Sequence, residues 1–213
     1  MTFAQAAGRG LYVITDGPRA DLLDVVAQAL AGGARLLQYR DKSNDSARRY
    51  AEAMTLKQLC HTHCVPLIIN DDITLAQAVA ADGVHLGKDD KDPGAARAIL
   101  GEDAIIGVSC YDSLRRARAA TRAGASYIAF GAFFASPTKP LAPHASIGLL
   151  RQSAALGVPR VAIGGITPDN ATSLVEAGAD YLAVISAVFG AGDVRQAAQR
   201  FTDLYLFTSG TAA

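Results

Sequence analysis

The sequence lacks several features that mark whole classes of protein. Its 20 basic and 20 acidic residues give no formal net charge. No global attraction to nucleic acid or to an anionic membrane is therefore expected, and local charges must hold any bound anion. Its three cysteines, Cys60, Cys64 and Cys110, do not suggest a disulfide framework. No apolar run approaches the length of a membrane span, and the start, MTFAQAAGRG, shows no signal peptide. These absences predict a soluble cytoplasmic protein.

What the sequence does contain is a repeated pattern. A small residue, usually glycine, precedes one polar position and then an apolar run in AGGARLLQYR (31–40), AADGVHLGK (80–88), AGASYIAFG (123–131) and AGADYLAVIS (177–186). Such a pattern is typical of a helix that ends at glycine, followed by a turn and a buried strand. The repeat indicates that one helix–strand unit recurs along the chain.

Filling the gaps between these repeats predicts eight strands, at 11–15, 35–40, 66–70, 83–86, 105–109, 127–130, 160–163 and 181–185. Amphipathic segments between them predict helices at 21–31, 45–63, 74–81, 93–100, 114–123 and 168–177. Pro93 and Pro168 fit the first turns of their helices. This alternation predicts an α/β protein in which residues 1–213 form a single (β/α)8 TIM barrel with flexible tails at 1–9 and 208–213. An open doubly wound sheet is the alternative, but no Gly-x-Gly-x-x-Gly follows the first strand.

Polar residues collect where the predicted strands end, which is where such barrels place their active sites. The stretch VPLIINDD (65–72) shows the pattern, because a buried apolar run stops on an amide and two carboxylates. Taken together, the strand ends supply three cations, carboxylates and two loops of small residues: Arg40, Lys42, Lys139, Asp71, Asp90, Gly164, Gly165 and Ser186. Carboxylates beside cations suggest a divalent metal acting with a polyanion. Small residues after strands seven and eight suggest a second, metal-free phosphate site.

Each of these features also has a purely structural explanation. Asp71 or Asp72 could cap the next helix. Asp89 and Asp90 could form a solvated loop, Gly164 and Gly165 could serve close packing, and Lys139 could be a surface lysine. His85 lies inside a strand and could be a core histidine or could face the pocket. The motif Cys60-His61-Thr62-His63-Cys64 is rejected as a metal site, because on a helix its histidines and cysteines point in different directions.

The chain resembles the thiamine phosphate synthase family over nearly its whole length, from Tyr12 to about Phe201. The resemblance rests on LYVITD, QYRDK, LIINDD, ADGVHLGKDD, IGVSC, FGAFFASPTKP, VAIGGITPDN and GADYLAVIS, which occur in the family's order. It implies a (β/α)8 barrel that joins hydroxymethylpyrimidine pyrophosphate to thiazole phosphate and releases pyrophosphate. Pyrophosphate would leave first, and the thiazole nitrogen would then attack the pyrimidine methylene.

The resemblance also implies roles for individual residues. The pyrimidine pyrophosphate would be held by Gln38, Arg40, Lys42, Asn70, Ser109 and Lys139, of which Arg40, Lys42, Ser109 and Lys139 would be catalytic. Asp71 and Asp90 would hold Mg²⁺. The thiazole phosphate would contact Ser136, Thr138, Gly165, Ile185 and Ser186. Tyr39, Asp41 and Pro137 stand within the same motifs and are included as substrate-binding candidates.

The sequence departs from the family pattern at a few positions, and rival functions remain open. Lys88 stands where the family often has Gln, Ser136 replaces a common Thr, and Tyr111 occupies a position that is often His. The closest rival is a thiazole tautomerase, followed by a non-catalytic sensor of a phosphorylated ligand and by another phosphate-binding barrel such as a sugar-phosphate epimerase. The expected partners are small-molecule substrates only, and a homo-oligomer is compatible with the sequence.

Overall fold

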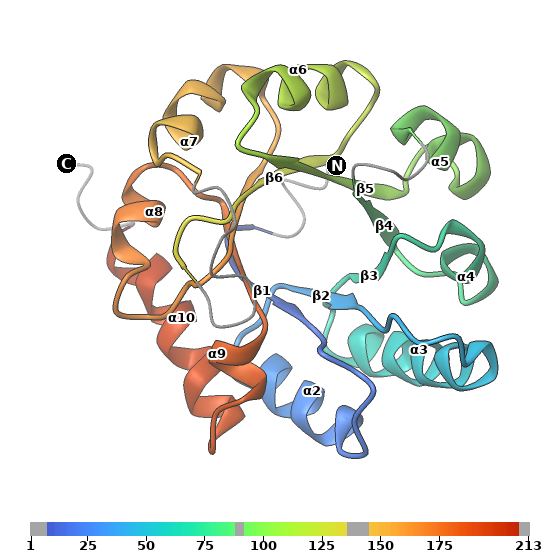
Figure 1. Ribbon diagram of the computed structural model, residues 1–213. Helices are drawn as coiled ribbons and strands as arrows, with labels where there is room; N and C mark the ends of the chain where they lie inside the picture. The colour runs from blue at the N-terminus through green and yellow to red at the C-terminus, as the bar shows by residue number, and fades with distance from the viewer. Residues whose placement is uncertain (1–7, 88–91, 136–144, 209–213) are drawn as a thin grey trace.

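The chain folds into a closed barrel of eight parallel strands surrounded by helices (Figure 1). The computed structural model describes residues 8–87, 92–135 and 145–208. The strands are β1 (Gly10–Ile14), β2 (Leu36–Tyr39), β3 (Leu67–Asn70), β4 (Gly83–Leu86), β5 (Ile105–Tyr111), β6 (Tyr127–Phe130), β7 (Arg160–Ile163) and β8 (Tyr181–Val184). Each strand pairs with the next along the chain, and β8 pairs with β1. The predicted barrel is confirmed, and the open doubly wound sheet is excluded.

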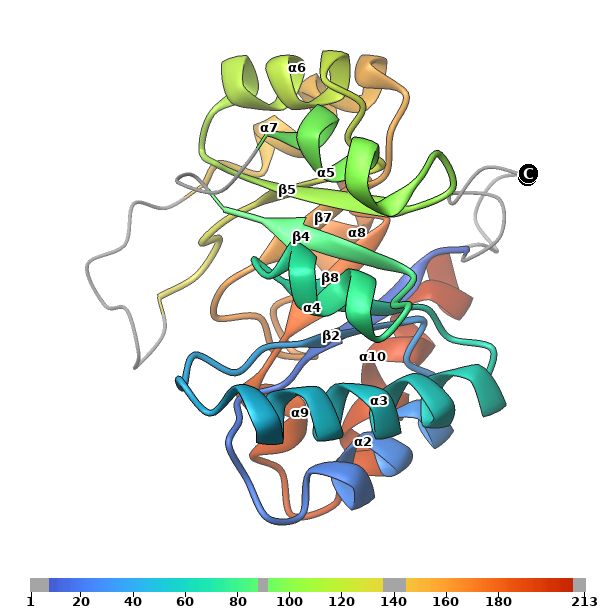
Figure 2. The same cartoon turned by 90° about the vertical axis from the view of Figure 1, so that its right-hand side faces the viewer.

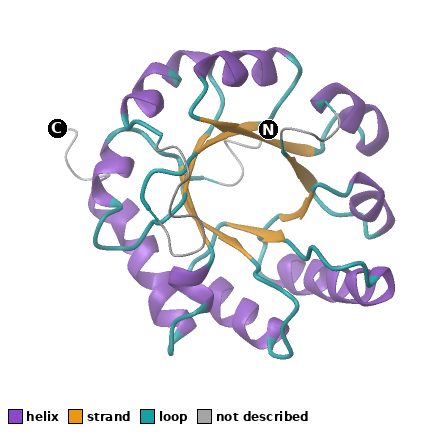
Figure 3. Ribbon diagram, viewed as in Figure 1, coloured by secondary structure: helices purple, strands orange, loops and turns teal. Residues whose placement is uncertain are grey.

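The helices form a ring outside the strands (Figure 3). They are α2 (Leu22–Ala31), α3 (Ser46–Thr62), α4 (Ile73–Ala78), α5 (Pro93–Leu100), α6 (Leu114–Arg122), α7 (Gly148–Gln152), α8 (Thr172–Glu176), α9 (Ser186–Phe189) and α10 (Val194–Thr208), with a short 3₁₀ helix, η1 (Ala154–Leu156), after α7. In the view of Figure 2, α2, α3, α9 and α10 lie together at the bottom of the molecule. The sequence prediction did not include α7, α9, α10 or η1.

Most element boundaries agree with the sequence prediction, and the exceptions have local causes. β5 is two residues longer than expected, because its pairing with β6 continues through an irregularity between Ser109 and Tyr111. Pro93 does occupy the first turn of its helix. Pro168 does not, because the Asn170 side chain accepts a hydrogen bond from Thr167 N and closes a separate turn, so that α8 begins only at Thr172.

Two apolar layers, one on each side of the strands, explain why the strand sequences show no polar alternation. The inner layer fills the barrel with Tyr12, Ile14, Leu36, Ile68, Ile105, Tyr127, Ala129, Val161, Tyr181 and Ala183. The alternate residues of the same strands, such as Leu37 and Ile69, pack outward against the helices. A residue two positions beyond an inner-layer residue therefore faces the barrel interior near the carboxyl end.

The predicted flexible tails lie mostly outside the described residues, but each includes a described residue with a defined place. Arg9 donates a hydrogen bond to Ala179 O (3.1 Å) and lies over the Tyr205 ring. Thr208 is the last residue of α10. Among the described residues, no helix is both long enough and apolar enough to span a bilayer.

Candidate active site

Four of the predicted substrate-binding residues lie at or next to the carboxyl ends of β2, β3 and β5. Gln38 lies two residues beyond Leu36, and Asn70 two beyond Ile68, so both face the interior. Arg40 follows directly after β2, and Ser109 lies near the end of β5. Gln38 is almost fully buried, whereas the other three are partly exposed. The site thus has a polar floor and a charged, solvent-accessible rim.

A chain of hydrogen bonds crosses the barrel below this site. Gln38 Nε2 donates to Tyr12 Oη (2.6 Å), which lies 2.8 Å from Tyr127 Oη. Tyr127 Oη lies 3.0 Å from His85 Nδ1, and His85 Nε2 lies 2.8 Å from Ser109 Oγ. These five residues come from five different strands, and the chain links two predicted substrate-binding side chains. His85 is therefore a buried residue of the barrel interior that supports the floor of the site.

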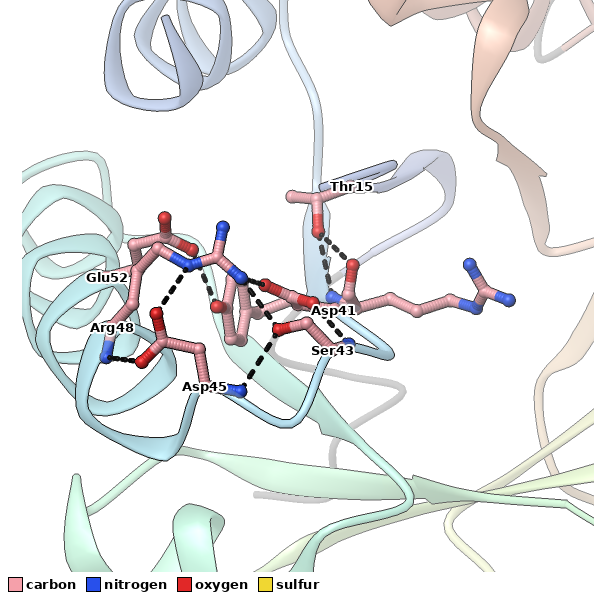
Figure 4. A network of polar contacts seen from close by, with 8 residues as sticks. Thr15, Asp41, Ser43, Asp45, Arg48 and Glu52 are labelled. Atoms are coloured by element: carbon pink, nitrogen blue, oxygen red, sulfur yellow. Dashed lines mark hydrogen bonds and ion pairs between the residues drawn. The ribbon is translucent and has the colours of Figure 1, made fainter. Parts of the chain in front are cut away.

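The segment that carries Arg40 and Lys42 is fixed from its outer side (Figure 4). Thr15 Oγ1 donates to Arg40 O (3.1 Å) and accepts from Arg40 N (2.8 Å). The Asp41 side chain has no exposed surface; it accepts from Arg48 Nη2 (2.7 Å) and from Ser43 N (2.7 Å). Neighbouring residues of an extended segment face opposite sides, so Arg40 faces the side opposite to Tyr39 and Asp41.

The structure does not bring the side chains of Tyr39 and Asp41 to the candidate site. Tyr39 points outward, is buried in the outer apolar layer, and donates to Glu52 Oε2 (2.6 Å). Burial raises the pKa of Asp41, but hydrogen bonds from Ser43 and the charge of Arg48 outweigh it and hold this pKa below its usual value. Asp41 is thus an ionised scaffold residue, and only the main chain of these two residues is left to meet a substrate.

The two aspartates after β3 have different surroundings. Asp71 is exposed and has a left-handed backbone with φ of 62°. Its N–H donates to His85 O (2.9 Å), and one carboxylate oxygen accepts from Asn70 Nδ2 (2.6 Å). Asp72 instead caps α4, because its side chain accepts from Leu75 N (2.9 Å) and from Arg49 Nη2 (2.8 Å). Capping by Asp72 is confirmed, and Asp71 is left as the candidate metal ligand.

The loops after β7 and β8 supply backbone rather than charge. Gly164 and Gly165 have φ of 103° and 62°, and a Cβ on Gly165 would lie 2.5 Å from Ala135 O. These glycines therefore do serve close packing. Ile185 directly precedes α9, and Ser186 is the exposed first residue of that helix. Because β7 pairs with β8, the two loops lie side by side.

Several candidates lie outside the described residues: Asp90, Ser136, Pro137, Thr138 and Lys139, together with Lys88 and Asp89. Their roles stay predictions. Within residues 8–87, 92–135 and 145–208, no three His, Cys, Asp or Glu side chains gather in a way that could hold a metal ion. The Asp71 carboxylate does provide the hard oxygen donor that Mg²⁺ prefers, so the chemistry of this strand end fits that ion.

Sequence reasoning missed four residues that hold the site together. Tyr12 and Tyr127 stand in apolar strand sequences, so the sequence predicts only that their rings belong to the core. It does not predict the hydrogen bonds of their hydroxyls. Arg48 stands in a charged helix where nothing distinguishes it. Arg116 donates to Ser109 O (2.6 Å) and to Gly87 O (2.7 Å), which ties the ends of β4 and β5 together. Only the strand alternation could have indicated that Tyr12 and Tyr127 face inward, where a polar partner is needed.

Comparisons with known proteins agree on one family. A family model described as thiamine monophosphate synthase matches residues 11–188. The thiamine-phosphate synthase of Azoarcus sp. (strain BH72) is 57% identical over 200 residues, covering 92% of this chain and 97% of the relative. That of Nitrosococcus oceani is 54% identical over 197 residues, covering 91% of each.

Solved structures give the same match. The thiamine phosphate pyrophosphorylase from Pyrococcus furiosus superposes with a TM-score of 0.86 at 36% identity, covering 97% of this chain and 99% of that one. A 3-hexulose-6-phosphate synthase superposes with a TM-score of 0.69 at 17% identity, covering 92% of this chain and 99% of that one. The second likeness shows the barrel fold alone.

Proposed function

This chain belongs to the thiamine monophosphate synthase family, and on that premise we propose that it is a thiamine-phosphate synthase. Its substrates are hydroxymethylpyrimidine pyrophosphate and thiazole phosphate, and its products are thiamine phosphate and pyrophosphate. The observation that carries the proposal is that Gln38, Arg40, Asn70 and Ser109 all lie at the same end of the barrel. An amide pair, a hydroxyl and a guanidinium suit a heterocycle that carries a polyanion.

The pyrophosphate group is held at the end of β2. Arg40 can bind its oxygens through two N–H groups at once, while Lys42 acts as a flexible point charge. The Asp41–Arg48 pair and Thr15 support this assignment, because they fix the backbone that carries both cations. Lys139, from the segment after β6, is proposed as a third cation.

Mg²⁺ is proposed as the cofactor, with Asp71 and Asp90 as the residues that would hold it. When bound, the ion neutralises charge on the pyrophosphate oxygens. The exposed Asp71 carboxylate, held at the rim by the turn at the end of β3, supports its part in this assignment. The thiazole phosphate is assigned to the loops after β7 and β8, with Gly165, Ile185 and Ser186, and to Ser136 and Thr138.

The reaction requires no nucleophilic side chain. The bond between the pyrimidine methylene carbon and the pyrophosphate oxygen breaks, and its electron pair leaves with that oxygen. The thiazole nitrogen then uses its lone pair to form the new bond to the methylene carbon. Arg40, Lys42 and Lys139 stabilise the departing negative charge, which is the largest contribution that a protein makes to such a step.

The rival functions find no support in the comparisons. The relatives reported above are thiamine-phosphate synthases, not tautomerases, sensors or epimerases. A tautomerase would use Tyr111 for proton transfer, but this residue is 46% exposed and lies against the Arg116 guanidinium. A cytoplasmic location and a homo-oligomeric state stay predictions from the sequence.

The test is to mix the purified protein with both substrates and Mg²⁺, and to follow thiamine phosphate by its oxidation to fluorescent thiochrome. Product should form with the wild type and should disappear with excess EDTA or in Asp71→Ala. Asp72→Ala is the matched control, because it removes a helix cap worth about 1 kcal/mol and should retain activity. Absence of product in the wild type, despite binding of thiazole phosphate, would contradict the proposed function.

A further inference from the structure

We propose that Tyr12, Tyr127 and His85 are positioning residues that set the hydrogen-bonding direction of Gln38 and Ser109. Through them the barrel interior selects an amino group over a carbonyl on the pyrimidine ring. The inference rests on the proposed function, since that function supplies the aminopyrimidine. Its basis is the unbroken chain of four hydrogen bonds that joins Gln38 to Ser109.

The direction of the chain follows from its first bond. Gln38 Nε2 donates to Tyr12 Oη. Either tyrosine could donate in the next bond, but the buried Tyr12 hydroxyl satisfies its own proton only by giving it to Tyr127 Oη, so we assign the donor role to Tyr12. Tyr127 in turn donates to His85 Nδ1, which must then be unprotonated. A neutral imidazole of this tautomer carries its proton on Nε2 and donates it to Ser109 Oγ. All four bonds therefore run the same way.

The barrel interior is shaped to hold these rings in place. Position 107 of β5 is a glycine, and a Cβ there would lie 2.0 Å from Tyr127 Cζ, so no larger residue fits beside this ring. The Tyr127 ring stacks on the His85 ring, with centroids 5.6 Å apart, and meets the Tyr12 ring edge-on at 6.0 Å. Burial raises the pKa of both tyrosines, so both hydroxyls keep the proton that the chain needs.

A chain with one direction has two different ends. At the β2 end, the Gln38 NH₂ group donates to Tyr12, and Gln38 Oε1 remains as an acceptor for the substrate. At the β5 end, Ser109 accepts from His85 and keeps its own proton as a donor. An aminopyrimidine offers the complement of both, because its exocyclic amine donates and its ring nitrogens accept. A 4-oxo analogue would place a carbonyl oxygen against Gln38 Oε1, and two acceptors repel each other.

Tyr127→Phe tests the proposal, because it removes the middle hydroxyl and keeps the ring. The Tyr12 proton then loses its acceptor and can turn to Gln38 Oε1, so the amide is free to present its NH₂ group to the substrate. The ratio of kcat/KM for the amino substrate to that for the 4-oxo analogue should fall by about tenfold or more. The KM for thiazole phosphate should stay unchanged. Tyr12→Phe should lower the same ratio.

Tyr181→Phe is the matched control, since it removes a hydroxyl of the same inner layer that takes part in none of the four bonds. It should leave the ratio unchanged. Nitrogen-15 NMR of the wild type should show His85 protonated at Nε2 and unprotonated at Nδ1. An unchanged ratio in Tyr127→Phe, or a His85 protonated at Nδ1, would overturn the proposal. A wild type without synthase activity would overturn the proposed function instead, and the His85 tautomer would still decide the direction of the chain.

Discussion

The carboxyl end of β2 and the carboxyl ends of β7 and β8 are built in different ways. At β2, charged side chains project from a backbone that Thr15, Asp41 and Arg48 hold by hydrogen bonds. At β7 and β8, the residues are glycines, an isoleucine and a serine, and backbone packing fixes the loop after β7. The proposed function assigns the pyrophosphate and its metal to the side-chain charges at β2, and the single phosphate to the backbone at β7 and β8.

The largest effect is expected from removing a charge at the β2 end. Arg40→Met should lower kcat/KM for the pyrimidine pyrophosphate by about a hundredfold or more, because a donor aimed at the departing charge is lost. The KM for thiazole phosphate should change little, since that substrate is assigned to the other end. Steady-state kinetics with each substrate varied in turn would measure both. An equal fall in kcat/KM for both substrates would contradict the assignment of the two substrates to different ends of the site.

Gly165→Ala should distort the backbone of the loop after β7. The new Cβ would lie 2.5 Å from Ala135 O and 2.6 Å from Phe134 O at a residue with φ of 62°, so the loop must shift. The free energy of unfolding should fall by about 3 kcal/mol, from the clash and the left-handed backbone together. Urea unfolding measures this, and Gly157→Ala separates the two causes. That residue shares a left-handed backbone but has open space around its Cβ position. Equal losses in the two variants would show that packing at Gly165 contributes nothing.

Arg48→Met should weaken the β2 end indirectly. It leaves the Asp41 carboxylate, which has no exposed surface, without the cation that lies 2.7 Å away. The free energy of unfolding should fall by about 2 kcal/mol, below the cost for a fully buried pair because Arg48 itself is 30% exposed. The KM for the pyrimidine pyrophosphate should rise more than kcat falls. Arg200→Met, which removes an exposed partner of Asp169, is the control and should change neither quantity. A KM equal to that of the wild type would show that the pair does not position Arg40 and Lys42.

The smallest effect concerns acid stability. The pKa of Asp41 is lowered in the folded protein, so its contribution is complete above the unfolded pKa of about 4 and is lost as the pH falls through the folded pKa. The free energy of unfolding of the wild type and of Asp41→Asn should therefore converge between about pH 5 and pH 2. Urea unfolding at several pH values measures the difference. Curves that stay parallel over this range would contradict a lowered pKa.

The sequence was sufficient for the architecture and for part of the site. Apolar runs after Gly33, Gly124 and Gly178 marked strands to within one residue, because a short apolar run that follows a turn glycine is typical of a strand buried on both faces. Helices α7 and α9 were missed because segments of four or five residues are too short to show a helical period. Gln38, Asn70 and Ser109 could be placed from strand alternation and family motifs. The direction of Tyr39 and Asp41 could not be taken from motif membership, since neighbours in a strand face opposite sides.

The contacts that hold the site in place could not be predicted from the sequence. Charged residues such as Arg48 usually lie on the solvated face of a helix. Nothing in the sequence therefore indicates that Arg48 pairs with Asp41. The chain from Gln38 to Ser109 joins residues up to 115 positions apart, which no local pattern reveals. Such contacts depend on the closure of the barrel, so they become visible only in three dimensions.

The division of the barrel into two anion sites can be tested by titrating each substrate separately into the wild type by isothermal calorimetry, with Mg²⁺ and then with excess EDTA. EDTA should abolish or strongly weaken binding of the pyrimidine pyrophosphate and should leave binding of the thiazole phosphate unchanged. Loss of both, or of neither, would contradict the division between a metal-dependent site at the β2–β4 end and a backbone site at β7 and β8.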